Sequence, residues 1–217
     1  MNMEAVVFDM DGIIFDSEKL VLECWQVVAE KYNIGDIETS CRNCLGLNRT
    51  ATKEYFLGVY GKDFPYDDYK KEMSDLFHKR AAGGNLDKKP GIEELLKFLK
   101  EKNIKLAVAS STRREVVVQE LRDGGLLTYF DAVIAGDMVQ RSKPCPDIFL
   151  KACEELDVAP KNAYAIEDSF NGIRAAKNAG MRPIMVPDMV EPDEEIKGLC
   201  ECVLENHFKV KEYMDLL

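Results

Sequence analysis

Residues 6–17 read VVFDMDGIIFDS, an apolar segment that ends abruptly in two aspartates and a glycine. Side chains two positions apart in extended backbone project to the same side, so Asp9 and Asp11 can converge just past the strand. Gly12 then allows a sharp turn. Two carboxylates held together repel unless a cation lies between them or one is protonated. The stretch therefore indicates a catalytic or metal site, with an acidic turn as the alternative.

The composition is that of a globular protein. The 217 residues are 46% hydrophobic and 31% charged, enough for one large domain or two small ones. A formal net charge of −10 argues against nucleic acid as a partner, because phosphate backbones are bound by clustered Lys and Arg. The apolar runs are too short for a membrane span, and no secretory signal is recognisable, so a cytoplasmic protein is expected.

Seven cysteines in a chain without an export signal favour reduced thiols over disulfides. Cys41 and Cys44 have the spacing of zinc ligands, and Cys200 and Cys202 form a second close pair. The two histidines of the chain are far apart in the sequence. Small, semi-buried thiols are therefore the favoured interpretation, and a structural zinc is the alternative.

The hydrophobic pattern divides the chain into a helical insertion and a region of alternating strands and helices. We expect an α/β core domain from residues 1–15 and 84–217, and an all-helical cap domain from residues 16–83. The glycine-containing residues 81–85 are the expected hinge. Trp25 recurs with other apolar residues at helical spacing and is expected to belong to the packing of the cap.

Beyond the cap, the alternation predicts a parallel sheet covered on both faces, which is a doubly wound, Rossmann-like α/β fold. The expected strands cover residues 105–109, 132–135, 163–166 and 183–186, with a last one near Val203. Five helices are expected over residues 50–59, 66–80, 90–102, 146–156 and 170–179. Three more are expected: one that begins at Asp16 or Ser17, one that begins near Thr112, and a short one at the end of the chain.

Polar groups follow three of the expected strands: Asp9 and Asp11, then Ser110 and Ser111, then Glu167 and Asp168. Ligands of parallel α/β sheets bind just beyond the carboxyl ends of the strands, so these groups are expected at one rim. The gathered acidic groups call for a hard cation, and Mg²⁺ fits better than Ca²⁺, which would take more protein oxygens. Ser110 offers its hydroxyl and backbone N–H groups to an anion, and N-capping is its alternative role.

Lys143 lies between Ser142 and Pro144 in a loop that two prolines stiffen. A lysine on a rigid loop is a fixed positive charge. If it faces the acidic rim, it can bind both Asp9 and a phosphoryl oxygen. A solvated surface lysine is the alternative.

Four motifs resemble, in order and spacing, those of the haloacid dehalogenase (HAD) superfamily. They are Asp9-Met10-Asp11-Gly12, Ser110, Lys143-Pro144-x-Pro146-Asp147 and Glu167-Asp168-Ser169-x-Asn171-Gly172. The resemblance extends from Glu4 to about Pro187. It is closest to capped subfamily I, which includes β-phosphoglucomutase and phosphoglycolate phosphatase.

The resemblance implies roles for the acidic residues. Asp9 would be the nucleophile that forms an aspartyl phosphate, and Asp11 would protonate the leaving alcohol and then deprotonate the acceptor. Mg²⁺ would be bound by Asp9, the backbone carbonyl of Asp11 and Asp168. Glu167 would be a further ligand, directly or through water.

Other residues are implied to bind the substrate. Ser110, Ser111 and Lys143 would hold the phosphoryl group. In the cap, residues 46–49 resemble a loop whose arginine meets a distal anionic group, so Arg49 is a candidate specificity residue. A solvated arginine at a helix start is the alternative. The β-phosphoglucomutases typically carry a cap histidine where this chain has Val21.

We therefore expect a Mg²⁺-dependent phosphatase that hydrolyses a small phosphorylated metabolite, such as a sugar phosphate, through an aspartyl-phosphate intermediate. Asp11 favours phosphoryl transfer over dehalogenation, and Val21 favours water over a sugar as the acceptor. A phosphosugar mutase of the β-phosphoglucomutase type is the first alternative. A non-catalytic phosphate-binding regulatory module is the second, although keeping these charges together is costly. A cap closed by its own core makes a monomer the expected state.

Overall fold

The computed structural model describes residues 3–44 and 49–217, which form two compact units. The larger unit combines the residues up to Asp16 with Asp87–Leu217, and the smaller unit is Ser17–Leu86. The expected division fell after residues 15 and 83, so both boundaries lie slightly later in the chain.

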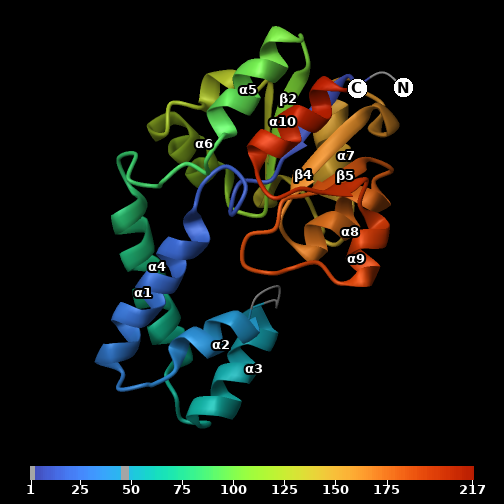
Figure 1. Ribbon diagram of the computed structural model, residues 1–217. Helices are drawn as coiled ribbons and strands as arrows, with labels where there is room; N and C mark the ends of the chain where they lie inside the picture. The colour runs from blue at the N-terminus through green and yellow to red at the C-terminus, as the bar shows by residue number, and fades with distance from the viewer. Residues whose placement is uncertain (1–2, 45–48) are drawn as a thin grey trace. The chain divides into compact units, whose positions relative to one another are not determined.

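The larger unit is built on a six-stranded parallel sheet of order β3-β2-β1-β4-β5-β6 (Figure 1). Its strands are β1 (Ala5–Phe8), β2 (Lys105–Ser110), β3 (Ala132–Ala135), β4 (Ala163–Glu167), β5 (Arg182–Met185) and β6 (Cys202–Val203). The register places Phe8 of β1 beside Val108 of β2 and Ile166 of β4. The residues that follow these three positions therefore meet at the same rim of the sheet.

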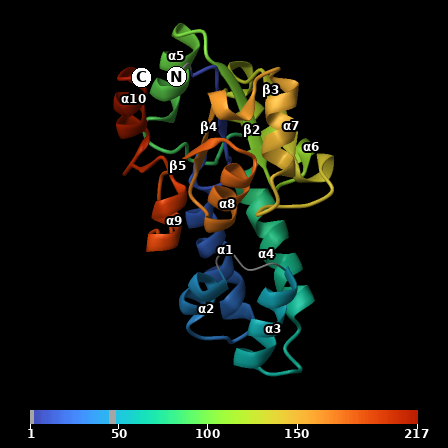
Figure 2. The same ribbon diagram turned by 90° about the vertical axis from the view of Figure 1, so that its right-hand side faces the viewer.

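Helices cover both faces of this sheet. They are α5 (Ile92–Glu101), α6 (Arg114–Asp123), α7 (Asp147–Glu155), α8 (Phe170–Asn178), α9 (Glu194–Leu199) and α10 (His207–Asp215). Figure 2 shows α5 and α10 on one side of the strands and α7 on the other. Phe149 of α7 and Ala175 of α8 share a buried cluster with Val7 and Ala107 of the sheet. The predicted doubly wound α/β fold is confirmed.

The smaller unit is all helical. It contains α1 (Ser17–Lys31), α2 (Ile37–Cys44), α3 (Arg49–Tyr60) and α4 (Tyr66–Ala81). Trp25 makes edge-to-face contacts with Phe56 and Tyr69, at centroid separations of 5.2 and 6.1 Å. The hydroxyl of Tyr69 donates a hydrogen bond of 2.8 Å to the backbone carbonyl of Trp25. The prediction that Trp25 is a packing residue is confirmed.

The predicted elements differ from the observed ones at two short helices and at the start of α6. The short helices α2 and α9 were not predicted, because eight and six residues show too few turns of periodicity to be recognised. Helix α6 begins at Arg114 and not near Thr112, because the Thr112 N–H and carbonyl are used in the turn after β2. They bond to the Ser110 hydroxyl and to the Gly136 N–H.

All seven cysteines are free thiols. Burial raises the pKa of Cys41 and of Cys200 to about 11, so these thiols are poor nucleophiles at neutral pH. Within residues 3–44 and 49–217, neither cysteine pair belongs to a cluster of metal-ligating side chains. None of the described helices has both the length and the apolar composition to cross a bilayer.

His207, at the start of α10, is buried, and its ring forms a hydrogen bond with the backbone. Nδ1 lies 3.3 Å from the carbonyl of Pro90, so Nδ1 carries the proton. Nε2 is buried and has no hydrogen-bond partner among the residues that the structure describes. Burial, reinforced by the charge of Lys89, lowers the pKa of His207 to about 4.

This histidine is expected to make the protein acid-sensitive. Between pH 6.5 and 4, His207 binds a proton in the unfolded chain but stays neutral in the folded chain. The free energy of unfolding therefore falls as the pH falls. The loss reaches about 3 kcal/mol. His207→Gln should remove this acid-dependent loss of unfolding free energy when denaturant unfolding is compared at pH 7.5 and 4.5. The exposed His78 gives the matched control, and equal pH dependence of His207→Gln and His78→Gln would contradict the assignment.

Candidate active site

The loop after β1 holds the two aspartates in place. The Asp9 N–H donates to the carbonyl of Ile166 in β4 at 2.9 Å, which continues the sheet by one residue. The chain then folds back, with a 3.0 Å hydrogen bond from the Gly12 N–H to the Phe15 carbonyl. Gly12 has a φ of +76°, a conformation that residues with a side chain rarely adopt. Asp9 and Asp11 thus lie at the carboxyl end of the central strand, as predicted.

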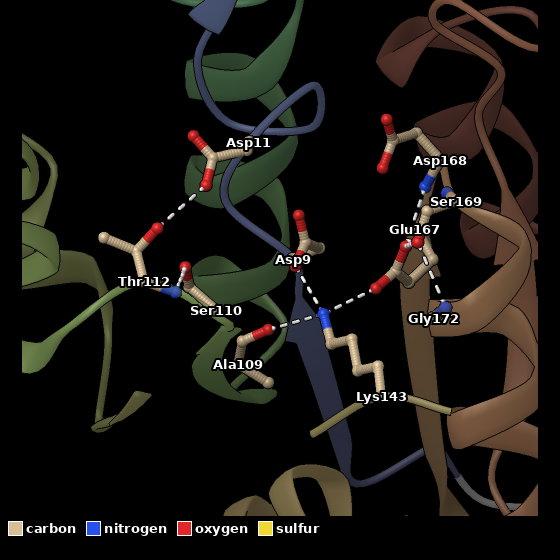
Figure 3. Close-up of polar contacts among 10 residues, drawn as sticks. All are labelled: Asp9, Asp11, Ala109, Ser110, Thr112, Lys143, Glu167, Asp168, Ser169 and Gly172. Carbon is tan, nitrogen blue, oxygen red and sulfur yellow. Dashed lines mark hydrogen bonds and ion pairs between the residues drawn. The ribbon is translucent and has the colours of Figure 1, made fainter. Parts of the chain in front are cut away.

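Lys143 connects the ends of three strands. Its Nζ donates to Oδ1 of Asp9 at 2.5 Å, to Oε1 of Glu167 at 2.6 Å and to the carbonyl of Ala109 at 2.9 Å (Figure 3). Its side chain is only 7% exposed. The prediction that Lys143 faces the acidic rim and pairs with Asp9 agrees with this geometry.

The charges of this cluster do not balance. Burial alone would lower the pKa of Lys143, but Asp9 and Glu167 more than offset it, so its pKa is raised and the amine stays charged. Burial, reinforced by Glu167 and Asp11 and opposed by Lys143, raises the pKa of Asp9 to about 8. The single positive charge of Lys143 therefore does not neutralise the negative charge of the carboxylates. Binding a further cation would stabilise the site.

Glu167 is fully buried and satisfied by hydrogen bonds. Its Oε2 accepts from the N–H of Asp168, and from the N–H and hydroxyl of Ser169, at 2.9–3.1 Å. Ser169 also caps α8 by accepting from the Gly172 N–H at 3.0 Å. A Cβ at Gly172 would overlap the Glu167 carboxyl group, so the glycine makes room for it.

Hydroxyl groups line the side of the site formed by β2. The Thr112 hydroxyl donates to Oδ2 of Asp11 at 3.3 Å, and the Thr112 N–H donates to the buried Ser110 hydroxyl at 3.1 Å. Ser110 therefore accepts a backbone hydrogen bond and keeps its own proton for an anion. Ser111 is exposed. Thr112 was not singled out from the sequence, although its place in a run of three hydroxyl residues was a usable signal.

Asp9, Glu167 and Asp168 form a potential metal site. Each offers a carboxylate oxygen, and these oxygens lie within 4.8 Å of one another. An all-oxygen donor set suits a hard divalent cation such as Mg²⁺. Figure 3 shows the second oxygen of Asp9 turned away from Lys143, toward the side where the Asp11 and Asp168 carboxylates lie.

A sequence model described as haloacid dehalogenase-like hydrolase matches residues 6–186. The chain belongs to this family. The predicted family resemblance is therefore confirmed. Each of the four motifs contributes residues to the rim described above: Asp9 and Asp11, Ser110, Lys143, and Glu167 with Asp168.

Named proteins similar to this chain are consistent with its membership of the family. A phosphorylated carbohydrates phosphatase from Thermotoga maritima is 37% identical over 215 residues, covering 99% of this chain and 98% of that protein. A β-phosphoglucomutase from Bacillus subtilis is 34% identical over 187 residues, covering 82% of this chain and 81% of that protein. The crystal structure of CbbY from Rhodobacter sphaeroides with phosphate matches with a TM-score of 0.77, at 32% identity and 96% coverage of both chains.

The predicted specificity residue belongs to the smaller unit. Arg49 begins α3, but residues 46–48 and the Arg49 side chain lie outside what the structure describes. Val21, in α1, packs against the aromatic core of the smaller unit. The role of Arg49 remains a prediction.

Proposed function

We propose that the protein is a Mg²⁺-dependent phosphatase that hydrolyses small phosphorylated carbohydrates through an aspartyl phosphate. The observation that carries the proposal is that the two carboxylate oxygens of Asp9 face different partners. Lys143 binds one carboxylate oxygen, and the other lies on the side shared by Asp11 and Asp168. This arrangement supports the proposal that Asp9 acts as the nucleophile, Asp11 as the proton-transferring carboxylate and Asp168 as a metal ligand.

Two steps follow from these positions. A carboxylate oxygen of Asp9 attacks phosphorus and the bond to the ester oxygen breaks, while Asp11 gives its proton to the leaving alcohol. The Asp11 carboxylate then takes a proton from water, which attacks phosphorus and releases inorganic phosphate and Asp9. In this proposal the Ser110 hydroxyl donates to a phosphoryl oxygen. Lys143, whose three N–H donors bind Asp9, Glu167 and the Ala109 carbonyl, would attract the phosphoryl group through its positive charge.

The residues present fit a magnesium ion. Asp9 and Asp168 are the best direct ligands, because Glu167 already accepts three hydrogen bonds on Oε2 and one from Lys143 on Oε1. Glu167 thus suits the water-mediated role better than the direct one. The bound ion would supply charge neutralisation for the carboxylates and the phosphoryl oxygens.

Phosphorylated carbohydrates are the proposed substrate class because the Thermotoga maritima relative, which spans nearly the whole chain, is named for that activity. A phosphosugar mutase is the second candidate, on the strength of the Bacillus subtilis relative. Val21, which is partly buried against the core of the smaller unit, favours the phosphatase, because a valine offers no proton-transferring group at that position.

Metal removal tests the proposal. Phosphate release from an aryl phosphate and from a panel of sugar phosphates should fall at least about 100-fold with EDTA, and recover with excess Mg²⁺. A rate indifferent to chelation would contradict the metal assignment. Turnover that needs a sugar bisphosphate primer and frees little phosphate would identify the mutase, and no turnover on any substrate would identify a non-catalytic module.

A further inference from the structure

Asp188, in the loop after β5, has a buried carboxylate oxygen that no hydrogen bond within the described part of the chain explains. Its Oδ1 accepts a 2.8 Å hydrogen bond from Nζ of Lys89, and its side chain is 13% exposed. Its Oδ2 is buried and has no hydrogen-bond partner among residues 3–44 and 49–217. A buried carboxylate oxygen loses its hydration without gaining a hydrogen bond in return, so its position requires a physical explanation.

Gly12 shows where the unpartnered oxygen lies. A Cβ built on Gly12 would overlap Oδ2 of Asp168 and lie 3.2 Å from Oδ2 of Asp188. The two carboxylate oxygens therefore approach the same side of Gly12, next to the catalytic loop. Asp188 thus lies beside Asp168, one of the proposed metal ligands, although it is outside the four sequence motifs.

A structural ion pair does not account for this arrangement. Lys89 also pairs with Asp16 at 3.6 Å, so its single charge is shared by two carboxylates. The pair with Asp188 uses only Oδ1. It fixes the orientation of the carboxylate and leaves Oδ2 beside Asp168, with no hydrogen-bond donor from the part of the chain that the structure describes.

We propose that Asp188 is a positioning residue of the metal site, whose Oδ2 accepts a hydrogen bond from a water molecule bound to Mg²⁺. The inference rests on the proposed function. Asp188 does not belong to the described group of carboxylates whose oxygens lie within 4.8 Å of one another, so it acts through water and not as a direct ligand. Mg²⁺ usually keeps several waters, and partners of this kind orient them.

The test is thermal unfolding of the full chain at a series of Mg²⁺ concentrations, with no substrate present. Asp188→Asn keeps the shape and removes the charge, and it should need about tenfold more Mg²⁺ for the same rise in melting temperature. Glu191→Gln removes one charge from an exposed position of the same loop and should leave the Mg²⁺ dependence within about twofold of the wild type.

Asp168→Asn separates this inference from the proposed function. If Asp168→Asn still responds to Mg²⁺ like the wild type, the metal site itself is wrong. If Asp168→Asn loses the response while Asp188→Asn keeps it, only the role of Asp188 is overturned. A purely structural role would lower the melting temperature of Asp188→Asn equally with and without Mg²⁺. Asp188→Ser, which leaves room for a water, is the second variant if Asp188→Asn does not fold.

Discussion

Replacing Asp9 by Asn is expected to lower the rate of phosphate release by about four orders of magnitude or more, because an amide does not attack phosphorus. The substitution preserves the size of the side chain and leaves Asp11 and Ser110 unchanged. The fold should survive, since the variant removes a carboxylate that burial disfavours in its charged form. Steady-state phosphate release at saturating Mg²⁺ measures the loss, and far-ultraviolet circular dichroism checks the fold.

The control for this variant is Asp137→Asn. Asp137 follows β3 at the same end of the sheet, is exposed, and accepts a 2.9 Å hydrogen bond from the Arg114 N–H. Its rate should stay within about twofold of the wild type. Acid quenching during turnover should also trap a phosphoryl group on the Asp9 peptide of the wild type. A trapped group elsewhere, or an Asp9→Asn variant that keeps its rate, would show that another residue is the nucleophile.

The position of the site could be predicted because it follows from local patterns and one topological rule. Asp9, Ser110 and Glu167 each come directly after an apolar run, and parallel strands bring their carboxyl ends to one rim. The register confirms the rule, since Phe8 lies beside both Val108 and Ile166. No distance information was needed, only the order of apolar and polar residues.

Asp188 and Thr112 could not be predicted in the same way. The orientation of Asp188 depends on Lys89, 99 residues away in the sequence, and no local pattern links the two. Thr112 stands in a visible run of hydroxyl residues, but its bond to Asp11 depends on how β2 lies beside β1. Residues that act by orienting another group have weak local signatures, because their chemistry depends on a tertiary contact.

The role of Lys143 could be predicted from the sequence only in part. Its loop predicted a rigid positive charge, and the rim predicted carboxylates, but the sequence did not show that one amine would join the ends of β1, β2 and β4. That role makes its removal costly. Lys143→Met is expected to lower the unfolding free energy by about 3–5 kcal/mol, because Asp9 and Glu167 would stay buried without their counter-ion. The rate should fall by about three orders of magnitude, because the fixed positive charge beside the phosphoryl group is lost.

The stability loss of Lys143→Met should depend on pH with a definite sign. Without the lysine, the pKa of Asp9, which burial already raises to about 8, should rise further. Asp9 then holds a proton that the unfolded chain releases, so the variant loses stability as the pH rises from 6 to 9. The methionine itself packs without difficulty, since Nζ of Lys143 lies 5.1 Å from the Phe149 ring centre. Denaturant unfolding at both pH values measures this loss against Lys151→Met, which removes one charge from a half-buried lysine of α7. If the two variants lose equal stability at pH 9, Lys143 is not the charge that holds the acidic rim together.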